Sequence, residues 1–497
     1  MSLLYTNSVY KVWIFQKNLR ICGFSAWGAR FLRHETARPV AKTVENLYNI
    51  NQTCMEQYRK GGGNMDYYKA ALELHEQHKG KIEVTAKVPV KTRDDLSAAY
   101  TPGVAEPCRE IAKDPAAAYT YTAKGNLVAV VTNGTAVLGL GDIGAAAAMP
   151  VMEGKAILFK EFGGVDAFPI CLDTKDPEQV IEAVRLLAPT FGGVNLEDIS
   201  SPNCFYIEET LEKELDIPVF HDDQHGTAII SGAGLINALE ITGKKAEDFI
   251  VVVSGAGAAA IACAKFYTEL GIDPANIRMF DSKGILHKGR TDLNKYKAQF
   301  ALSEDMTMTE ALKGADLFLG LSKKDLLTPD MIKGMADHPV IFACANPDPE
   351  IAYPLAMETR PDCIMGTGRT DFPNQINNLS GFPYIFRGAL DVYATEINEA
   401  MKLAAARALA ALAKEPVPAE VSAAYQGQTF SFGQGYVIPK PFDPRLIEWL
   451  PPAVAQAAMD TGVARKPIED MDAYKASLRV RIQKAQGRAN ALIESYK

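Results

Sequence analysis

The stretch FIVVVSGAGAAAIACAKFYTELG, residues 249–271, decides the fold. Its first five residues are apolar and predict a short buried strand, and the small-residue turn after them leads into a long apolar helix pattern. A second strand, NIRMF at residues 276–280, comes next and ends at Asp281, 24 residues beyond Gly257. A strand, a glycine turn, a helix and an acid-tipped strand in this order are typical of a βαβ unit that binds a dinucleotide.

The turn itself matches the pattern GxGxx[GA] from Gly255 to Ala260. Small side chains let the backbone come close to a pyrophosphate at a helix N-terminus, where free N–H groups favour anions. The residues predicted to do this are Gly255, Gly257, Ala258 and Ala260.

The choice of dinucleotide depends on Asp281 and the loop after it. Asp281 can accept a hydrogen bond from a ribose hydroxyl, which favours NAD. The loop is basic, with Lys283, Lys288 and Arg290, and could hold the 2′-phosphate of NADP or simply be solvated. We expect NADP, with NAD as the alternative.

A second match to the glycine pattern, Gly139 to Gly144, has a different setting. Pro150 comes soon afterwards, and no acid-tipped strand lies at the right distance. We interpret this match as a tight turn that shapes another pocket.

Strand and helix patterns alternate along most of the chain. NLVAVVTNG and KAILFKEF are candidate strands, and DPEQVIEAVRLLAPTFG is a candidate helix. This rhythm predicts an α/β fold with parallel sheets in two domains. We expect an N-terminal substrate domain at 65–216, a Rossmann-like doubly wound domain at 217–455, with an irregular proline-rich end (YVIPKPFDPRLIEWLPP), and a helical tail at 456–497.

Residues 1–64 differ from the rest. The first fifty residues carry seven lysines and arginines against two acids, and a Gly61–Gly63 break comes after them. An organellar transit peptide, a disordered tail, or translated sequence upstream of a start at Met65 would each explain this composition. We expect a cytoplasmic protein, or a protein of an organelle matrix if the leader is a transit peptide.

The overall composition excludes several classes. The chain has 497 residues, a formal net charge of −8 and 47% hydrophobic residues, so neither a nucleic-acid partner nor a membrane is expected. The eight cysteines are scattered without a CxxC pair, which favours free thiols in a reducing compartment.

Two pairs of adjacent carboxylates point to a cation. Asp222 and Asp223 lie where a short strand, PVF, gives way to a helix pattern that starts at about Thr227, and Glu197 and Asp198 come after another apolar stretch. Two buried neighbouring carboxylates need compensation. An oxygen-rich set without cysteine suits Mg²⁺ or Mn²⁺. One aspartate of a pair can face the cation and the other a basic side chain.

Nine stretches in this order resemble the malic enzyme family, in particular its compact bacterial-type branch without the C-terminal acyltransferase-like domain. The resemblance spans roughly residues 80–480. The stretches are LSAAYTPGVAEPC (96–108), NGTAVLGLGDIG (133–144), PVMEGKAILFK (150–160), NLEDIS (195–200), PVFHDDQHGTAI (218–229), VSGAGAAAIA (253–262), FDSKGILHKGR (280–290), ANPDPEI (345–351) and GRTDFPNQINN (368–378).

This resemblance implies oxidative decarboxylation of malate to pyruvate and CO₂ by an NADP-preferring enzyme. It implies a general base at Lys155, which needs a lowered pKa and which Asp222 orients, and an acid at Tyr100 that protonates C3. The implied metal ligands are Glu197, Asp198 and Asp223.

The same resemblance places substrate or nicotinamide contacts at Asn346 and Asn378. It implies a homodimer or a higher homo-oligomer. Ala136 stands where longer eukaryotic-type relatives have an arginine that grips a substrate carboxylate, so the anchor of the second malate carboxylate is open. His221 and His225 are interpreted as packing or supporting residues rather than ligands. The rival interpretations are a related decarboxylating 2-hydroxyacid dehydrogenase with a larger substrate and a non-catalytic dinucleotide sensor.

Overall fold

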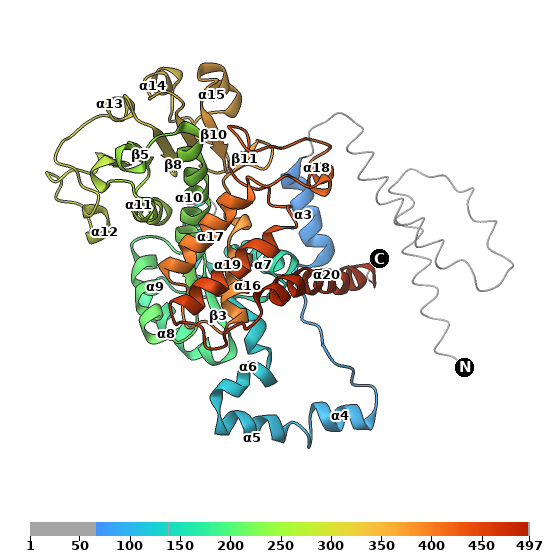
Figure 1. Cartoon of the computed structure of the whole chain (residues 1–497). Helices are drawn as coiled ribbons and strands as arrows, with labels where there is room; N and C mark the ends of the chain where they lie inside the picture. Colours follow the sequence, from blue (N-terminus) through green and yellow to red (C-terminus); the bar gives the residue numbers. More distant parts are fainter. Residues whose placement is uncertain (1–65, 138, 496–497) are drawn as a thin grey trace, which may run out of the picture. The chain divides into compact units, whose positions relative to one another are not determined.

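The computed structural model describes residues 66–137 and 139–495. The chain divides into two compact units, residues 1–79 and 80–497. In the first unit, helix α3 (Tyr67–His78) is described, and its N-cap is the Asp66 side chain. The leader expected at 1–64 lies outside the described residues, as does Met65. All other elements belong to the second unit (Figure 1).

A four-stranded parallel sheet comes first in the second unit. Its strand order is β2-β1-β3-β4. The bounds are β1 Leu127–Thr132, β2 Asp166–Cys171, β3 Gly193–Leu196 and β4 Val219–His221. Strands β1, β3 and β4 are almost fully buried, as expected for a parallel sheet covered by helices on its faces.

A seven-stranded sheet comes second, in the order β11-β10-β9-β8-β5-β6-β7. Every pair in it is parallel except β6 with β7. The bounds are β5 Val251–Ser254, β6 Ile277–Asp281, β7 Gly284–Ile285, β8 Leu317–Gly320, β9 Val340–Ala343, β10 Ile364–Thr367 and β11 Asn374–Gln375. From β5 the chain proceeds to β6 on one side and to β8 on the other, which makes β5 the switch point where ligands bind in such sheets. The predicted α/β fold with a Rossmann-like domain is confirmed.

Helices join the strands and cover both sheets. Those before β5 are α4 Arg93–Ala99, α5 Ala105–Lys113, α6 Ala118–Tyr121, α7 Ala145–Gly163, α8 Pro177–Leu187, α9 Asn203–Glu214 and α10 Asp222–Thr242. Those after β5 are α11 Ala258–Glu269, α12 Lys295–Ala298, α13 Met308–Leu312, α14 Pro329–Lys333, α15 Tyr353–Thr359, α16 Phe382–Asp391, α17 Glu399–Leu412, α18 Ala419–Ala424, α19 Leu446–Asp460 and α20 Met471–Ser495. One continuous apolar core includes residues of both sheets.

Two local predictions were wrong. KAILFKEF, expected as a strand, belongs to helix α7, whose buried residues recur every three or four positions from Ala145 to Gly163. LIEWLPP, expected to be irregular, opens helix α19, which contains Pro451 and Pro452. In both segments, the short apolar run belongs to the buried face of a long helix, which we mistook for a strand in one segment and for irregular structure in the other.

Two further features concern the boundaries of the predictions. Helix α10 begins at Asp222 rather than near Thr227, so the acidic pair occupies its first turn. Strand β4 joins the four-stranded sheet through β3, so that sheet extends to His221. The division at 216/217 stays a prediction. Among the described residues, no helix combines the length and apolar character needed to cross a bilayer.

Candidate active site

The register of two strands brings the two acidic pairs together. Strands β3 and β4 are parallel neighbours, with Leu196 opposite His221. Glu197 and Asp198 therefore leave β3 at the level where Asp222 and Asp223 leave β4. The pairs are adjacent in space although about 25 residues separate them in the sequence.

Lys155 reaches this acidic group from helix α7. Its Nζ lies 2.6 Å from Asp222 Oδ2 and 2.9 Å from Glu197 Oε1, and the residue is only 8% exposed. The Phe382 ring, at the start of α16, covers the ammonium with its centroid 4.2 Å away. The Asn378 amide donates to Asp222 Oδ2. Four of the predicted site residues, Lys155, Asp222, Glu197 and Asn378, thus meet in one contact group.

The second aspartate of the pair faces another way. The backbone N–H of Asp198 donates to Asp223 Oδ2 at 2.8 Å. Asp198 adopts a left-handed φ of 54°, a conformation that turns the chain sharply after Glu197. One carboxylate oxygen from each of Glu197, Asp198 and Asp223 lies within 4.8 Å of the others. Asp222 thus contacts a basic side chain, and Asp223 lies in a group of carboxylate oxygens; that this group holds a cation stays a prediction.

The charges in this group do not balance. Four carboxylates surround one ammonium, and burial raises the pKa of Glu197 and of Asp222 to about 7 and that of Asp223 to about 6. Burial also works to lower the pKa of Lys155, but the Asp222 and Glu197 carboxylates outweigh it, so its pKa lies above the ordinary value. The lowered pKa that the general base needs depends on a nearby metal cation as well as on burial, so it stays a prediction.

The excess of negative charge fits a divalent cation. Three carboxylates that each offer one oxygen, with no cysteine beside them, match the hard ligands that Mg²⁺ and Mn²⁺ prefer. A cation there would compensate the carboxylates that Lys155 alone cannot.

The dinucleotide loop lies at the end of β5. Gly255 has a φ of 118°, and a Cβ on it would lie 2.7 Å from the Leu321 carbonyl oxygen, so only glycine fits there. Gly257 caps α11, whose first residue is Ala258. A Cβ on Gly257 would meet no atom within 4 Å, so its surroundings are open. The loop has the geometry expected of an anion site at a helix N-terminus.

Asp281 already accepts hydrogen bonds from two cationic side chains, and its predicted contact with a ribose stays a prediction. Arg290 donates to both of its oxygens at 2.8 and 2.9 Å, and Lys297 donates to Oδ2 at 2.8 Å. Burial opposes the effect, but these cations lower the pKa of Asp281. Of the two predicted lysines, Lys283 is paired with Asp292, and Lys288 is exposed.

The remaining predicted residues, Asn346 and Tyr100, are both exposed. Asn346 comes after β9 and is exposed; its carbonyl oxygen lies 2.9 Å from where a Cβ on Gly139 would be, so the turn at Gly139 packs on it. Tyr100 caps α4 and is 67% exposed. Figure 1 shows α4 and α5 projecting away from α7, so within one chain the structure does not bring Tyr100 and Lys155 together.

Several supporting residues were missed by the sequence reasoning. Asn195 donates to Glu197 Oε2 at 2.8 Å, and its place in NLEDIS could have indicated it. Glu208, buried in α9, accepts from the His221 backbone N–H at 2.7 Å and from the Gln224 amide at 2.8 Å. It also lies 3.0 Å from His225. No local signal marks Glu208 or Phe382, because their roles depend on how distant helices pack.

Two family models match the chain. Malic enzyme, N-terminal domain, matches residues 79–212, and Malic enzyme, NAD binding domain, matches residues 224–423.

Curated relatives carry the same family name. An NADP-dependent malic enzyme of Rhizobium meliloti is 57% identical over 83% of this chain and 54% of its own length. Another, of Halomonas elongata, is 55% identical over 80% of this chain and 95% of its own length. The chain thus spans about half the length of the first relative and nearly all of the second.

A solved structure shares the fold. The malic enzyme of Pyrococcus horikoshii is 43% identical with a TM-score of 0.78, over 87% of this chain and all of that chain. Both domain models, the relatives and this solved structure point to one family. The chain belongs to the malic enzyme family.

Proposed function

We propose that this protein catalyses the oxidative decarboxylation of (S)-malate to pyruvate and CO₂ with reduction of NADP or NAD, in the presence of Mg²⁺ or Mn²⁺. The observation that carries the proposal is the contact of Lys155 with Asp222 and Glu197 beside the oxygen cluster of Glu197, Asp198 and Asp223. A 2-hydroxyacid bound there would place its hydroxyl between a base and a cation.

Lys155 and Asp222 act as one proton-accepting unit. Lys155 takes the C2 hydroxyl proton while hydride leaves C2, and bound NADP supplies the hydride acceptor. A lysine with a raised pKa starts protonated, so it must first release a proton. Asp222, whose Oδ2 lies 2.6 Å from Lys155 Nζ, is the nearest group to take that proton once a bound cation lowers the pKa of Lys155. Asn378 and Phe382 hold this pair in place.

The acid cluster prepares the site for the carboxylate-bearing substrate. A divalent cation held by Glu197, Asp198 and Asp223 would supply Lewis-acid polarisation of the C2 oxygen and stabilise the enolate left when the bond to CO₂ breaks. Asn195 fixes the Glu197 side chain through its amide. Protonation of C3 by a tyrosine hydroxyl completes pyruvate, and Tyr100 is the residue that we assign to this step.

Tyr100 needs a second copy of the chain to reach the site. It is exposed on an arm, residues 93–113, whose helices α4 and α5 contain no buried residue. Leu96, also on this arm, is 50% exposed. We propose a homodimer in which the arm of each copy inserts Tyr100 beside Lys155 of the other. Pairing of two copies would cover the exposed apolar side chains of the arm and would also complete the site.

We propose NADP as the preferred dinucleotide. Asp281 already accepts hydrogen bonds from Arg290 and Lys297, so its oxygens are engaged and cations crowd the position of the 2′ group. We also propose the division of the chain into a substrate domain at 65–216 and a dinucleotide domain at 217–455, with a helical tail after them.

Steady-state assays of the full chain test this function. We expect NAD(P)H and CO₂ to be released from malate only with Mg²⁺ or Mn²⁺, and expect Lys155→Ala to remove turnover. A panel of larger 2-hydroxy diacids addresses the rival substrate class. Absence of malate turnover with both cofactors and both metals would refute the proposal, and dinucleotide binding indifferent to metal would favour a sensor.

A further inference from the structure

A cavity of about 460 Å³ lies apart from the acid cluster, and its lining is strongly basic. Seven lysines and arginines line it against two aspartates, an excess of five positive charges in a chain whose formal net charge is −8. The volume is within the range of small-molecule sites. A cavity lined by positive charge on an acidic protein attracts anionic ligands.

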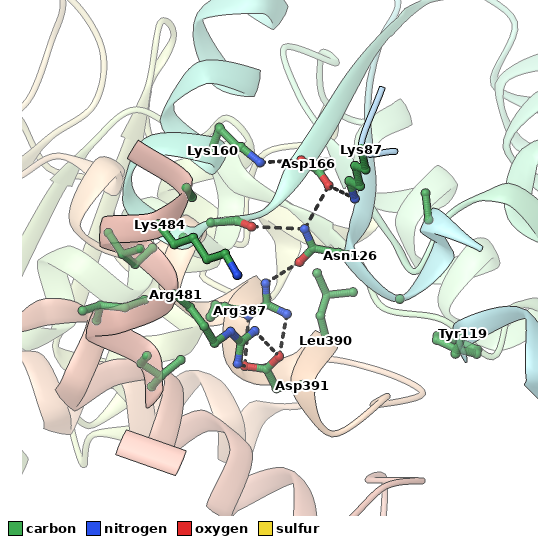
Figure 2. Close-up of a pocket in the computed structure, with 18 of the residues that line it drawn as sticks. Lys87, Tyr119, Asn126, Lys160, Asp166, Arg387, Leu390, Asp391, Arg481 and Lys484 are labelled. Atoms are coloured by element: carbon green, nitrogen blue, oxygen red, sulfur yellow. Dashed lines mark hydrogen bonds and ion pairs between the residues drawn. The ribbon is translucent and has the colours of Figure 1, made fainter. Parts of the chain in front are cut away.

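Both aspartates hold cations at the wall of the cavity. Asp391 accepts from Arg387 at 2.6 and 3.0 Å and from Arg481 at 2.7 and 3.0 Å. Asp166 accepts from Lys160 at 2.7 Å and from Lys87 at 3.0 Å. Figure 2 shows these two carboxylates on either side of Asn126, which bridges them by contacts with Asp166 and Arg387.

Helix α20 contributes a row of cations to the same cavity. Arg481, Lys484 and Arg488 succeed one another at the spacing of a single helix face. Among the described residues, Lys484 and Arg488 have no carboxylate within 4.0 Å, and in Figure 2 the Lys484 ammonium points toward Asn126 and Arg387. The positive charges of Lys484 and Arg488 can therefore pair with an anionic ligand.

We propose that this cavity is a binding site for a small organic phosphate with two or three phosphate groups. Arginine forks match phosphate oxygens in pairs, and lysines add point charges around them. The partly exposed side chains of Tyr119, Tyr393 and Ile482 line the same cavity and provide a surface for the organic part. The cavity is larger than one phosphate ion requires, which favours the multiply charged ligand.

The site shares two helices with the candidate active site. Helix α7 carries Lys155 and, further along, Lys160. Helix α16 carries Phe382, which covers Lys155, and ends at Asp391. A ligand that draws Lys160 and Arg387 toward itself would shift α7 and α16, the two helices that position Lys155. The site is therefore regulatory as well as ligand-binding.

Isothermal titration with inorganic tripolyphosphate tests the binding. The full chain is saturated with NADP first, so that the Gly255 loop cannot hold the probe. We expect the Lys484→Glu/Arg488→Glu double variant to bind at least about tenfold more weakly than the wild type, because two attractive contacts become repulsive. Lys475→Glu, on the opposite face of α20 and outside the cavity lining, is the matched control and should bind within about twofold of wild type.

Three binding results would overturn the proposal. They are no heat of binding in the wild type, equal affinity in the wild type and the double variant, and citrate binding as tightly as tripolyphosphate. The first two remove the site, and the third removes the preference for phosphate.

A kinetic arm tests the coupling and rests on the proposed function. Tripolyphosphate should change the KM for malate or kcat at least about twofold in the wild type and not in the double variant. Binding without any kinetic change would overturn the regulatory role. Absence of all malate turnover would instead refute the proposed function. The titration would then still decide whether the cavity binds a phosphate ligand.

Discussion

Complementation between two inactive variants would show whether Tyr100 works in the partner's site. Tyr100→Ala removes the proposed proton donor, and Lys155→Ala removes the base; each homodimer should fall to about 1% of wild-type activity or less, as expected for lost acid–base groups. In a mixed dimer, Lys155 of the first variant meets Tyr100 of the second, so one complete site is restored and the other lacks both groups.

The expected recovery comes from counting sites. Random pairing of equal amounts gives about half mixed dimers, each with one of two sites intact, or about one quarter of wild-type activity per chain. Co-expression with two different affinity tags isolates the mixed dimer, which should reach about one half. If both residues belonged to the same chain, no combination would contain a complete site.

The assay is NADPH formation from malate with Mn²⁺, and the variants should differ little in stability. Tyr100 is exposed, so its truncation leaves no buried cavity. A mixture of Lys155→Ala and Asp223→Ala serves as the control, because all their partners lie in one chain and no recovery is expected. Recovery no greater than the sum of the two inactive homodimers would refute the transfer of Tyr100 between copies.

The site and the core support three further predictions. Asp223→Ala should abolish Mn²⁺-dependent turnover while the circular dichroism spectrum is retained; near-normal activity would contradict the metal assignment. Gly226→Ala places a Cβ 2.1 Å from Asp222 Oδ1 and should lower kcat about 10- to 100-fold by displacing that side chain, whereas Gly487→Ala, with no atom within 4 Å, should leave kcat unchanged. Burial lowers the pKa of Lys440 to about 8. Between about pH 8 and pH 10.5, Lys440 is largely deprotonated in the folded chain and still protonated in the unfolded chain. The free energy of unfolding should therefore rise over this pH range, by at most about 3 kcal/mol. Urea denaturation should show that the rise is missing in Lys440→Met, and an equal rise in both proteins would contradict the assignment.

The sequence was most informative where chemistry is local. The turn at Gly255 and the acids after β3 and β4 were predictable because a glycine with positive φ and paired buried carboxylates each restrict what the chain can do. Their adjacency was also predictable once parallel strands were expected, since neighbouring strands end at the same edge of a sheet.

The sequence was least informative where long-range packing decides. The raised pKa of Lys155 depends on how close Asp222 and Glu197 come, and the engagement of Asp281 depends on a side chain nine residues further on, Arg290. The strand predicted at KAILFKEF shows the same limit, because a short apolar run has no period long enough to distinguish a strand from a buried helix.

Helix α10 has a consequence for motion within the protein. It begins with the two aspartates at the edge of the first sheet, runs on to the second sheet and packs along α11. A rigid rotation of one sheet against the other would strain α10, because its first turn stays with β3 and β4 in the first sheet while the helix also packs along α11. Such a rotation would need a bend within α10 itself, where Gly226, Gly232 and Gly234 lie in the helix interior.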